Sequence, residues 1–233
     1  MTECDAVLAR FEELTAISGD DEDVAALMAS ACQEILGADG AAITVDDAWL
    51  RRTTLCATDD IAGRLEDLQD ITGEGPCCDA YRLDEAVVTS VGEGSAVRWP
   101  GFISAARQAI GQFTMHSFPM HAGGDIYGAL SVYVAGGRAL SVSLAAAQRL
   151  VDAVGIALMR IPARNVLGSD GQWSSPMVLH QATGMVIAQL EIAADDALAV
   201  LRARAYASNQ SLADVAAEVV ARRLDFKDQR NNG

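Results

Sequence analysis

The chain has 233 residues, a formal net charge of −15 and five cysteines. This length allows one large domain or two small ones, and the acidic balance argues against a chain that binds nucleic acid over its whole surface. No stretch approaches ~18 uncharged apolar residues, so no membrane-spanning helix is expected, and the odd cysteine count without a signal peptide predicts the reducing cytoplasm.

Two helices are expected near the N-terminus. The first covers about Asp5 to Ala16. The second follows the acidic run at residues 19–23, since acidic residues favour a helix N-terminus, and its apolar residues recur at helical spacing. These apolar residues are Val24, Leu27, Met28, Ala31 and Ile35.

Five runs typical of strands follow, at residues 41–45, 50–58, 86–91, 112–120 and 126–134. In the last run, Leu130, Val132 and Val134 alternate with small or polar neighbours, as in a half-buried strand. Consecutive strands with helices on either side predict an α+β domain with an antiparallel sheet.

Two adjacent cysteines follow a helix-start signal. Gly75 and Pro76 predict the start of a short helix, which places Cys77 and Cys78 in its first turn. A helix N-terminus lowers the pKa of a thiol and favours the thiolate, so a redox-sensing role is one interpretation. The other is a pair of small buried thiols that only pack. The cysteines show no C-x-x-C pair and no paired metal spacing, so no metal site is expected.

Two histidines lie in or beside the predicted strands. His116 either faces a pocket, where it could bind haem, or is an ordinary core or surface residue. His121 precedes Gly123 and Gly124 and is expected to be an exposed neighbour of a turn.

A longer helix is expected from Leu144 to Ile161, where Pro162 ends it. Its apolar residues keep a/d spacing over two and a half heptads, which is typical of a coiled coil. We expect this helix, together with the N-terminal helix, to form a homodimer seam; the alternative is a core helix of a monomer. Residues 163–175 contain Gly and Ser and predict a flexible linker, in which Trp173 docks on either domain.

The last segment carries three short helical patterns in tandem. The first starts at Pro176, a residue tolerated at helix starts, and the second runs from about Asp195 to Ala207. The third begins at Ser211, which forms an S-x-x-D start signal with Asp214. Small residues in these helices, among them Ala182 and Gly184, are expected to allow close packing.

Charge is distributed unevenly along the chain. Residues 163–233 hold seven basic and eight acidic residues, so almost all of the excess negative charge lies upstream. A phosphate backbone would dock on this segment with the smallest electrostatic penalty. Arginine suits phosphate because its planar fork donates two hydrogen bonds. The candidates are Arg202, Arg204, Arg222 and Arg223, of which the last two also fit a positively charged helix C-terminus.

The body of the chain from about Glu22 to Ile161 resembles the GAF sensory domain of actinobacterial regulators. The carrying runs are GEGPCCDAYRLDEAVV, RWPGF and SFPMHAGGDIYGALSVYV, which start at Gly73, Arg98 and Ser117. The resemblance implies an antiparallel sheet flanked by helices and, in many members, a pocket beside the sheet. The N-K-F-D-E pattern of cyclic-nucleotide binders and an evident bilin-attachment cysteine are absent, so no cofactor is identified. The sensor-pocket candidates are Cys77, Cys78, His116 and Tyr133.

The tail resembles the ANTAR domain through HQATGM, DDALAVLRARAYA and SLADVAAEVVARRL, which start at His180, Asp195 and Ser211. The resemblance implies a three-helix RNA-binding module that binds paired stem-loops in leader RNA and prevents a terminator hairpin from forming. Thr183 stands where many members have lysine. Loop bases are read by stacking and by hydrogen bonds to their edges. The full set of candidate RNA contacts is His180, Gln181, Thr183, Arg202, Arg204, Tyr206, Asn209, Arg222 and Arg223.

We therefore expect an α+β GAF sensor over residues 1–161, a linker over 162–175 and an all-α three-helix ANTAR domain over 176–226. The expected function is a cytoplasmic, signal-responsive regulator that binds paired RNA hairpins in leader transcripts and causes transcription antitermination. A homodimer is expected, and an unidentified small-molecule ligand or an upstream kinase is left open as the source of the signal.

Two other functions are alternatives to this one. In the first, the tail binds a protein partner rather than RNA. In the second, the chain is an enzyme that reduces methionine sulfoxide with Cys77 and Cys78, but a disulfide between neighbouring residues is strained. No enzyme activity is expected, because the sequence offers no triad, paired carboxylates or metal cluster.

Overall fold

A computed structural model describes residues 2–16, 24–45, 52–92, 98–160, 176–208 and 210–227. The predicted linker, Trp173, Ile161 and Asn209 lie outside these residues. The N-terminal part contains a five-stranded antiparallel sheet, as the sequence predicts, and its strand order is β2-β1-β5-β4-β3. The strands are β1 (Gly40–Val45), β2 (Thr53–Ala57), β3 (Val87–Val91), β4 (Phe113–Ala122) and β5 (Asp125–Ala135).

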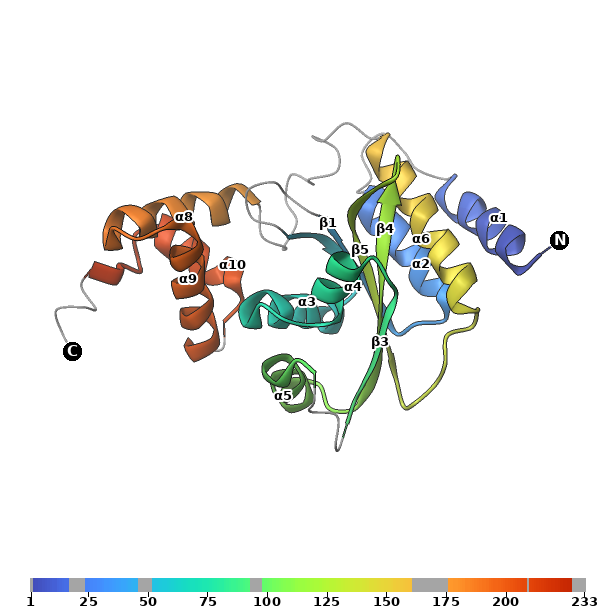
Figure 1. The fold of residues 1–233 in the computed structure, drawn as a ribbon, viewed down its shortest axis with the longest axis horizontal. Coiled ribbons are helices and arrows are strands. Elements are labelled where there is room, and N and C mark those ends of the chain that lie inside the picture. The colour runs from blue at the N-terminus through green and yellow to red at the C-terminus, as the bar shows by residue number, and fades with distance from the viewer. Residues whose placement is uncertain are drawn as a thin grey trace.

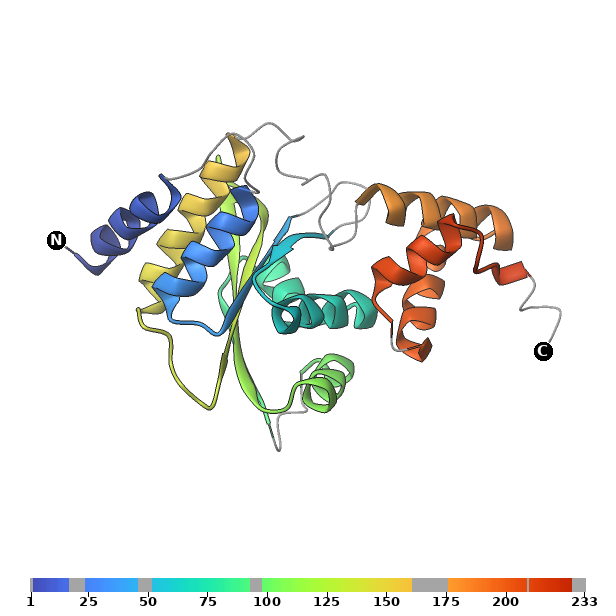
Figure 2. The same cartoon turned by 180° about the vertical axis from the view of Figure 1, so that it is seen from behind.

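Helices cover both faces of this sheet, as Figures 1 and 2 show. One face packs against α2 (Val24–Leu36) and α6 (Leu144–Met159), and α1 (Glu3–Thr15) lies outside these two helices. The other face packs against α3 (Asp60–Thr72), α4 (Pro76–Leu83) and α5 (Pro100–Ala109). The result is an α+β domain with two separate apolar clusters, one on each side of the sheet.

The pairing of β4 with β5 decides which side chains face which helices. Met115 pairs with Tyr133, and both belong to the cluster under α3, α4 and α5. The next pair, His116 and Val132, points to the opposite face because successive side chains of a strand alternate. His116 is thus separated by the sheet from Tyr133 and from the helix that carries the paired cysteines.

The expectation that the a/d stripe of α6 forms a dimer seam is wrong. The stripe with a/d spacing packs against the sheet and helices of its own chain, and four of its members are completely buried. They are Ala147, Val151, Val154 and Leu158. Gly155 allows close contact with β4, since a Cβ there would lie 2.5 Å from the carbonyl oxygen of His121. The alternative of a core helix therefore holds for this stripe.

The tail forms three helices, α8 (Pro176–Leu190), α9 (Ala194–Ser208) and α10 (Leu212–Val220), within two residues of the predicted bounds of the first two. The hydroxyl of Ser211 accepts a hydrogen bond from the amide of Asp214 at 3.0 Å, which confirms the predicted helix start. Small apolar residues fill the centre of this bundle, including the completely buried Ala182. Gly184 does not assist packing as expected, because it is exposed and a Cβ there would contact nothing.

The bundle of α8, α9 and α10 lies beside α3, with α9 and α10 both in contact with that helix (Figures 1 and 2). Helix α3 therefore contacts both the sheet of the N-terminal domain and the C-terminal bundle. A change on one side of this helix has a direct physical route to the other.

Candidate sensor site and RNA-binding surface

Helix α3, which the sequence analysis did not predict, positions most of the polar side chains beside the sheet. Its first turn is capped by Asp59, which accepts a hydrogen bond from the amide of Ala62 at 2.6 Å. It ends at Gly73, whose left-handed conformation (φ 69°) suits glycine. Within the helix, Glu66 and Gln69 are completely or almost completely buried, which is rare for such residues unless they are paired.

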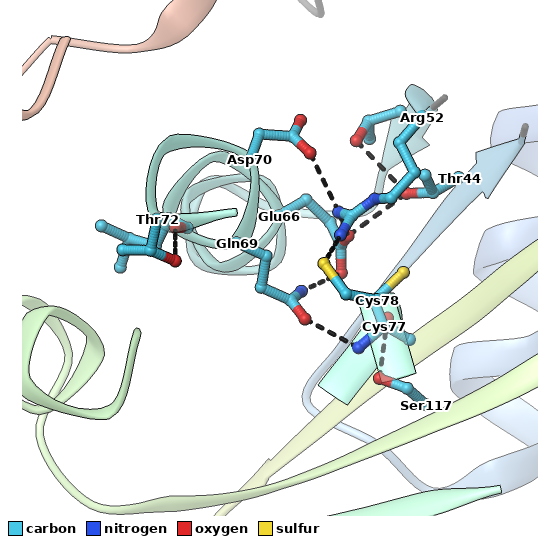
Figure 3. A network of polar contacts seen from close by, with 12 residues as sticks. Thr44, Arg52, Glu66, Gln69, Asp70, Thr72, Cys77, Cys78 and Ser117 are labelled. Carbon is cyan, nitrogen blue, oxygen red and sulfur yellow. Dashed lines mark hydrogen bonds and ion pairs between the residues drawn. The ribbon is translucent and has the colours of Figure 1, made fainter. Parts of the chain in front are cut away.

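Arg52 is the centre of a polar network between α3, α4 and the sheet (Figure 3). Its Nη2 atom lies 3.0 Å from Oε2 of Glu66 and 3.1 Å from Oδ1 of Asp70, and its Nη1 atom donates to Sγ of Cys78. One guanidinium group thus connects two carboxylates and a thiol. Breaking such a buried network by removing one partner is costly, because the remaining charges stay buried.

One hydroxyl side chain, Thr44, and one amide side chain, Gln69, also belong to the network (Figure 3). Thr44 donates to Oε2 of Glu66 at 3.2 Å, and Gln69 donates to Oε1 of the same carboxylate at 2.9 Å. The side-chain oxygen Oε1 of Gln69 accepts a hydrogen bond from the backbone amide of Cys77 at 2.7 Å, so the Gln69 side chain also caps α4. The space beside the sheet is occupied at this point by the protein's own polar groups.

The paired cysteines lie where the sequence predicts, in the first turn of α4, but their chemistry differs from the thiolate interpretation. Burial raises the pKa of Cys77 well above its ordinary value, although the Arg52 guanidinium acts in the opposite direction. Burial likewise raises the pKa of Cys78, again opposed by Arg52. A neutral buried thiol is a poor nucleophile. The alternative of small packing thiols agrees with these directions.

The four predicted sensor-pocket residues do not form one site. Cys77 and Tyr133 belong to the face of the sheet under α3 and α4, where the Tyr133 hydroxyl donates to Oδ2 of Asp59 at 2.7 Å. His116 lies on the opposite face, 7% exposed and stacked on Phe118, and neither of its ring nitrogens has a hydrogen-bond partner among the described residues. Burial lowers the pKa of His116, which favours the neutral ring.

The expectation that His121 is an exposed neighbour of a turn is wrong. It lies in β4, and its imidazole bridges two carboxylates from different helices, Asp152 of α6 at 2.8 Å and Asp84 at the C-terminal cap of α4 at 2.6 Å. These partners raise the pKa of His121, the Asp152 hydrogen bond most strongly. The residue ties the two helical layers together at one edge of the sheet.

Two of the sequence runs that resemble a known family are joined by specific contacts. Glu74 accepts hydrogen bonds from the amides of Gly101 and Phe102, at 2.7 and 3.2 Å, and so satisfies the first turn of α5. Asp79 accepts from Arg98 at 2.6 Å and from the indole of Trp99 at 2.9 Å. These residues therefore hold α4 and α5 together.

The candidate RNA contacts are spread over the bundle. Gln181 is exposed on α8, whereas Thr183 is buried and its hydroxyl donates to the Leu179 carbonyl at 2.8 Å. Thr183 therefore packs inside the bundle, where it presents no surface to RNA. On α9, Tyr206 is 63% exposed, while Arg204 is half-buried and its Nε atom has no hydrogen-bond partner among the described residues.

Arg222 and Arg223 lie just beyond the end of α10, and both are exposed. Arg222 has a left-handed conformation (φ 56°), and the amide of Arg223 donates back to the carbonyl of Glu218 at 2.8 Å. This geometry ends the helix and places two positive charges at its negative pole. The helix-terminus interpretation and an RNA role are thus compatible for this pair.

Over the ranges that the structure describes, no group of three or more His, Cys, Asp or Glu side chains is placed to hold a metal ion. Across the same ranges, each helix is too short or too polar to cross a bilayer.

Comparison with protein-family models gives two matches, a GAF domain over residues 18–159 and an ANTAR domain over residues 175–220. A search of curated proteins found no match. Among solved structures, a domain assigned to a two-component sensor histidine kinase of Sinorhizobium meliloti 1021 is 18% identical, with a TM-score of 0.48, and covers 66% of this chain and 100% of its own.

Two further solved structures are similarly distant. The nlh2 GAF domain of A. aeolicus in an inactive state is 12% identical, with a TM-score of 0.46, over 68% of this chain and 98% of its own. The chromophore-binding domain of the Stigmatella aurantiaca bacteriophytochrome is 13% identical, with a TM-score of 0.46, over 68% and 59%. The two family models carry the assignment, and these distant likenesses add nothing to it.

Proposed function

Because the chain belongs to the GAF family and carries an ANTAR domain behind its GAF domain, we propose that it binds paired RNA hairpins in leader transcripts and causes transcription antitermination in response to a signal. ANTAR domains are RNA-binding antitermination modules, GAF domains are sensors, and both are regulatory rather than catalytic. The proposal assigns RNA binding to α8, α9 and α10 and signal perception to the domain around the sheet.

The observation that carries this proposal is the exposed pair Arg222 and Arg223 on a near-neutral bundle that follows a strongly acidic domain. A phosphate backbone is repelled by the acidic half and meets the least repulsion at the bundle. Exposed Gln181 and Tyr206 add a hydrogen-bonding side chain and an aromatic ring, the chemistry that unstacked loop bases require.

Two copies of the chain fit an RNA target with two hairpins. A handful of arginines in one bundle makes a weak electrostatic footprint, whereas two linked bundles gain affinity because the second contact becomes intramolecular. The proposal therefore includes a homodimer. Since the a/d stripe of α6 is buried in its own chain, the dimer contact must use another surface.

Gel shifts with a leader RNA of two hairpins, and with the same RNA lacking one hairpin, test this function. Tight binding is expected only with both hairpins. Replacing Arg222 and Arg223 by Ala is expected to weaken binding and to reduce the salt slope by about 1 for each lost phosphate contact. The matched control replaces Arg107 and Arg160 by Ala, which removes the same charge from exposed positions of the GAF domain.

A protein partner for the bundle is the rival outcome of this experiment. If the full-length protein binds no hairpin RNA even at low salt, where electrostatic attraction is greatest, the RNA assignment fails. A loss of affinity that is equal in the control variant would instead remove the assigned contacts at Arg222 and Arg223.

A further inference from the structure

The contact between α3 and the C-terminal bundle joins the two domains through one apolar residue and a set of charges. Ile71 of α3 is 6% exposed and, among the described residues, is the one member of the GAF domain in the apolar cluster of the bundle. That cluster also contains Leu201 and Ala205 of α9 and Leu212 and Val215 of α10. Helix α3 therefore completes the bundle's core at this point.

Arg202 of α9 lies at the C-terminal end of α3. A Cβ placed on Gly73, the cap of α3, would lie 3.7 Å from Nη1 of Arg202, and the Nε atom of Arg202 is buried. The last turn of α3 has no basic residue of its own. The carbonyls at the C-terminal end of a helix carry partial negative charge, so the end of α3 is a favourable place for the Arg202 guanidinium.

Asp70 connects this contact to the buried network. Its carboxylate lies 3.1 Å from Arg52 and also attracts Arg202. Burial raises the pKa of Asp70, and the two guanidinium groups, Arg52 first, act in the opposite direction. Asp70 thus forms an ion pair with the arginine at the centre of the GAF network and attracts an arginine predicted to bind RNA.

The packing at this junction is incomplete. A cavity of about 440 Å³ lies between α3, α5 and α9, and Tyr206 lines it together with Leu68, Ile71 and Ala205. Because Tyr206 is 63% exposed, this cavity is open to solvent. Helices separated by open space give up less packing on separation than helices in full contact do.

One charge at the junction opposes the contact. Burial raises the pKa of Asp67 to about 7, helped by the like charges of Asp70 and Glu66 on its own helix and of Asp214 on α10, while Arg64 acts in the opposite direction. When Asp67 is ionised, α3 and α10 repel each other at this point. The junction thus contains both an attractive pair and a repulsive pair of charges.

We propose that α3 and RNA compete for the same face of α9, so that docking on α3 withholds Arg202 from RNA, and that Asp70 links this docking to the Arg52 network. The inference rests on the RNA-binding function proposed above. A signal that draws Asp70 toward Arg52 would weaken its hold on Arg202 and release α9. The GAF domain would then control RNA binding by covering one face of α9, without any change in the fold of the bundle.

Three variants of the full-length protein test this competition, because two are expected to bind RNA more tightly and the third more weakly. Asp70→Asn and Ile71→Ala weaken docking and are expected to tighten binding of the two-hairpin RNA, within the range of about 5- to 150-fold found for coupled sites. Asp67→Asn removes the repulsion and is expected to weaken RNA binding several-fold. Both aspartate variants remove one negative charge from α3, so a general electrostatic effect would tighten RNA binding in both. Ile71→Ala leaves the Arg52 network intact if Asp70→Asn impairs folding.

Labelling of Arg202 by phenylglyoxal, read by peptide mass spectrometry, reports docking without RNA. The labelling rate is expected to rise in Asp70→Asn and Ile71→Ala and to fall in Asp67→Asn. Unchanged labelling in the first two would overturn docking. Increased labelling with unchanged RNA affinity would overturn competition. Absence of RNA binding in every variant at low salt would instead sink the proposed function, and the competition with it.

Discussion

The two domains are stabilised in different ways. The GAF domain buries charged side chains beside its sheet, with Arg52, Glu66 and Asp70 in one network. The ANTAR bundle has an apolar core in which alanines pack among larger apolar side chains, and the side-chain hydrogen bonds of its described residues are mostly local, such as Thr183 to Leu179 and Ser208 to Arg204. A buried charged network responds to any change in charge or protonation, whereas an apolar core responds to volume alone. The GAF domain is therefore the half whose stability is more sensitive to a change in charge or protonation.

Removing Arg52 makes the sharpest test of this contrast. Arg52→Met leaves Glu66 and Asp70 buried without their shared partner, which is expected to cost about 3–5 kcal/mol in the free energy of unfolding. Urea unfolding followed by circular dichroism measures the loss. The control is Arg10→Met, which removes an exposed pairing with Glu13 and Glu34 and is expected to change little. A loss no larger than that of the control would contradict a charged network in the GAF core.

A volume change in the bundle tests the other half of the contrast. Leu201 is completely buried in α9, so Leu201→Ala is expected to cost about 3 kcal/mol through lost contacts and a cavity. Amide hydrogen exchange is expected to quicken in α8, α9 and α10 more than in the sheet. Leu198→Ala, at a half-buried position of the same helix, is the matched control and should cost clearly less. Equal losses would argue that the bundle's core is not centred on Leu201.

The smallest expected effect is a pH dependence confined to the GAF domain. The pKa of His121 is raised above 6.5 by Asp152 and Asp84, so its ion pairs contribute fully below pH 6.5 and are lost as the pH rises through the folded-state pKa. The stability difference between the wild type and His121→Asn is expected to be largest near about pH 5.5 and to shrink toward about pH 8.5. Urea midpoints across this range measure it. The ionisation of Asp67 acts in the same direction but cancels in the difference, and a difference that grows with pH would reverse the assignment.

The elements with regular apolar periodicity were predictable from the sequence. The structure confirms the five predicted strands and the predicted helices α1, α2, α6, α8, α9 and α10. Helix α3 was not predicted because its inward face is partly polar: Glu66 and Gln69 are buried, which inverts the usual rule of polar residues outside. The polar residues of α3 that form the network are therefore the residues that interrupt its apolar pattern in the sequence.

The site contacts depend on pairs far apart in the chain. His121 meets Asp84 and Asp152, and Asp79 meets Trp99, through sheet register and helix placement that no local motif encodes. The a/d spacing of α6 is equally consistent with a coiled coil and with a helix covering a sheet, and only the presence of the sheet decides between them. Motif resemblance supplied the domain families, whereas the partners of each side chain needed the fold.

Crosslinking in living cells tests the central claim most directly. Ultraviolet light would join the full-length protein to whatever lies against α8, α9 and α10, and sequencing would identify any captured RNA. We expect leader transcripts that contain two neighbouring hairpins, recovered less efficiently from a variant with Arg222 and Arg223 replaced by Ala. Recovery of polypeptides alone, with no enrichment of nascent leader RNA, would contradict it.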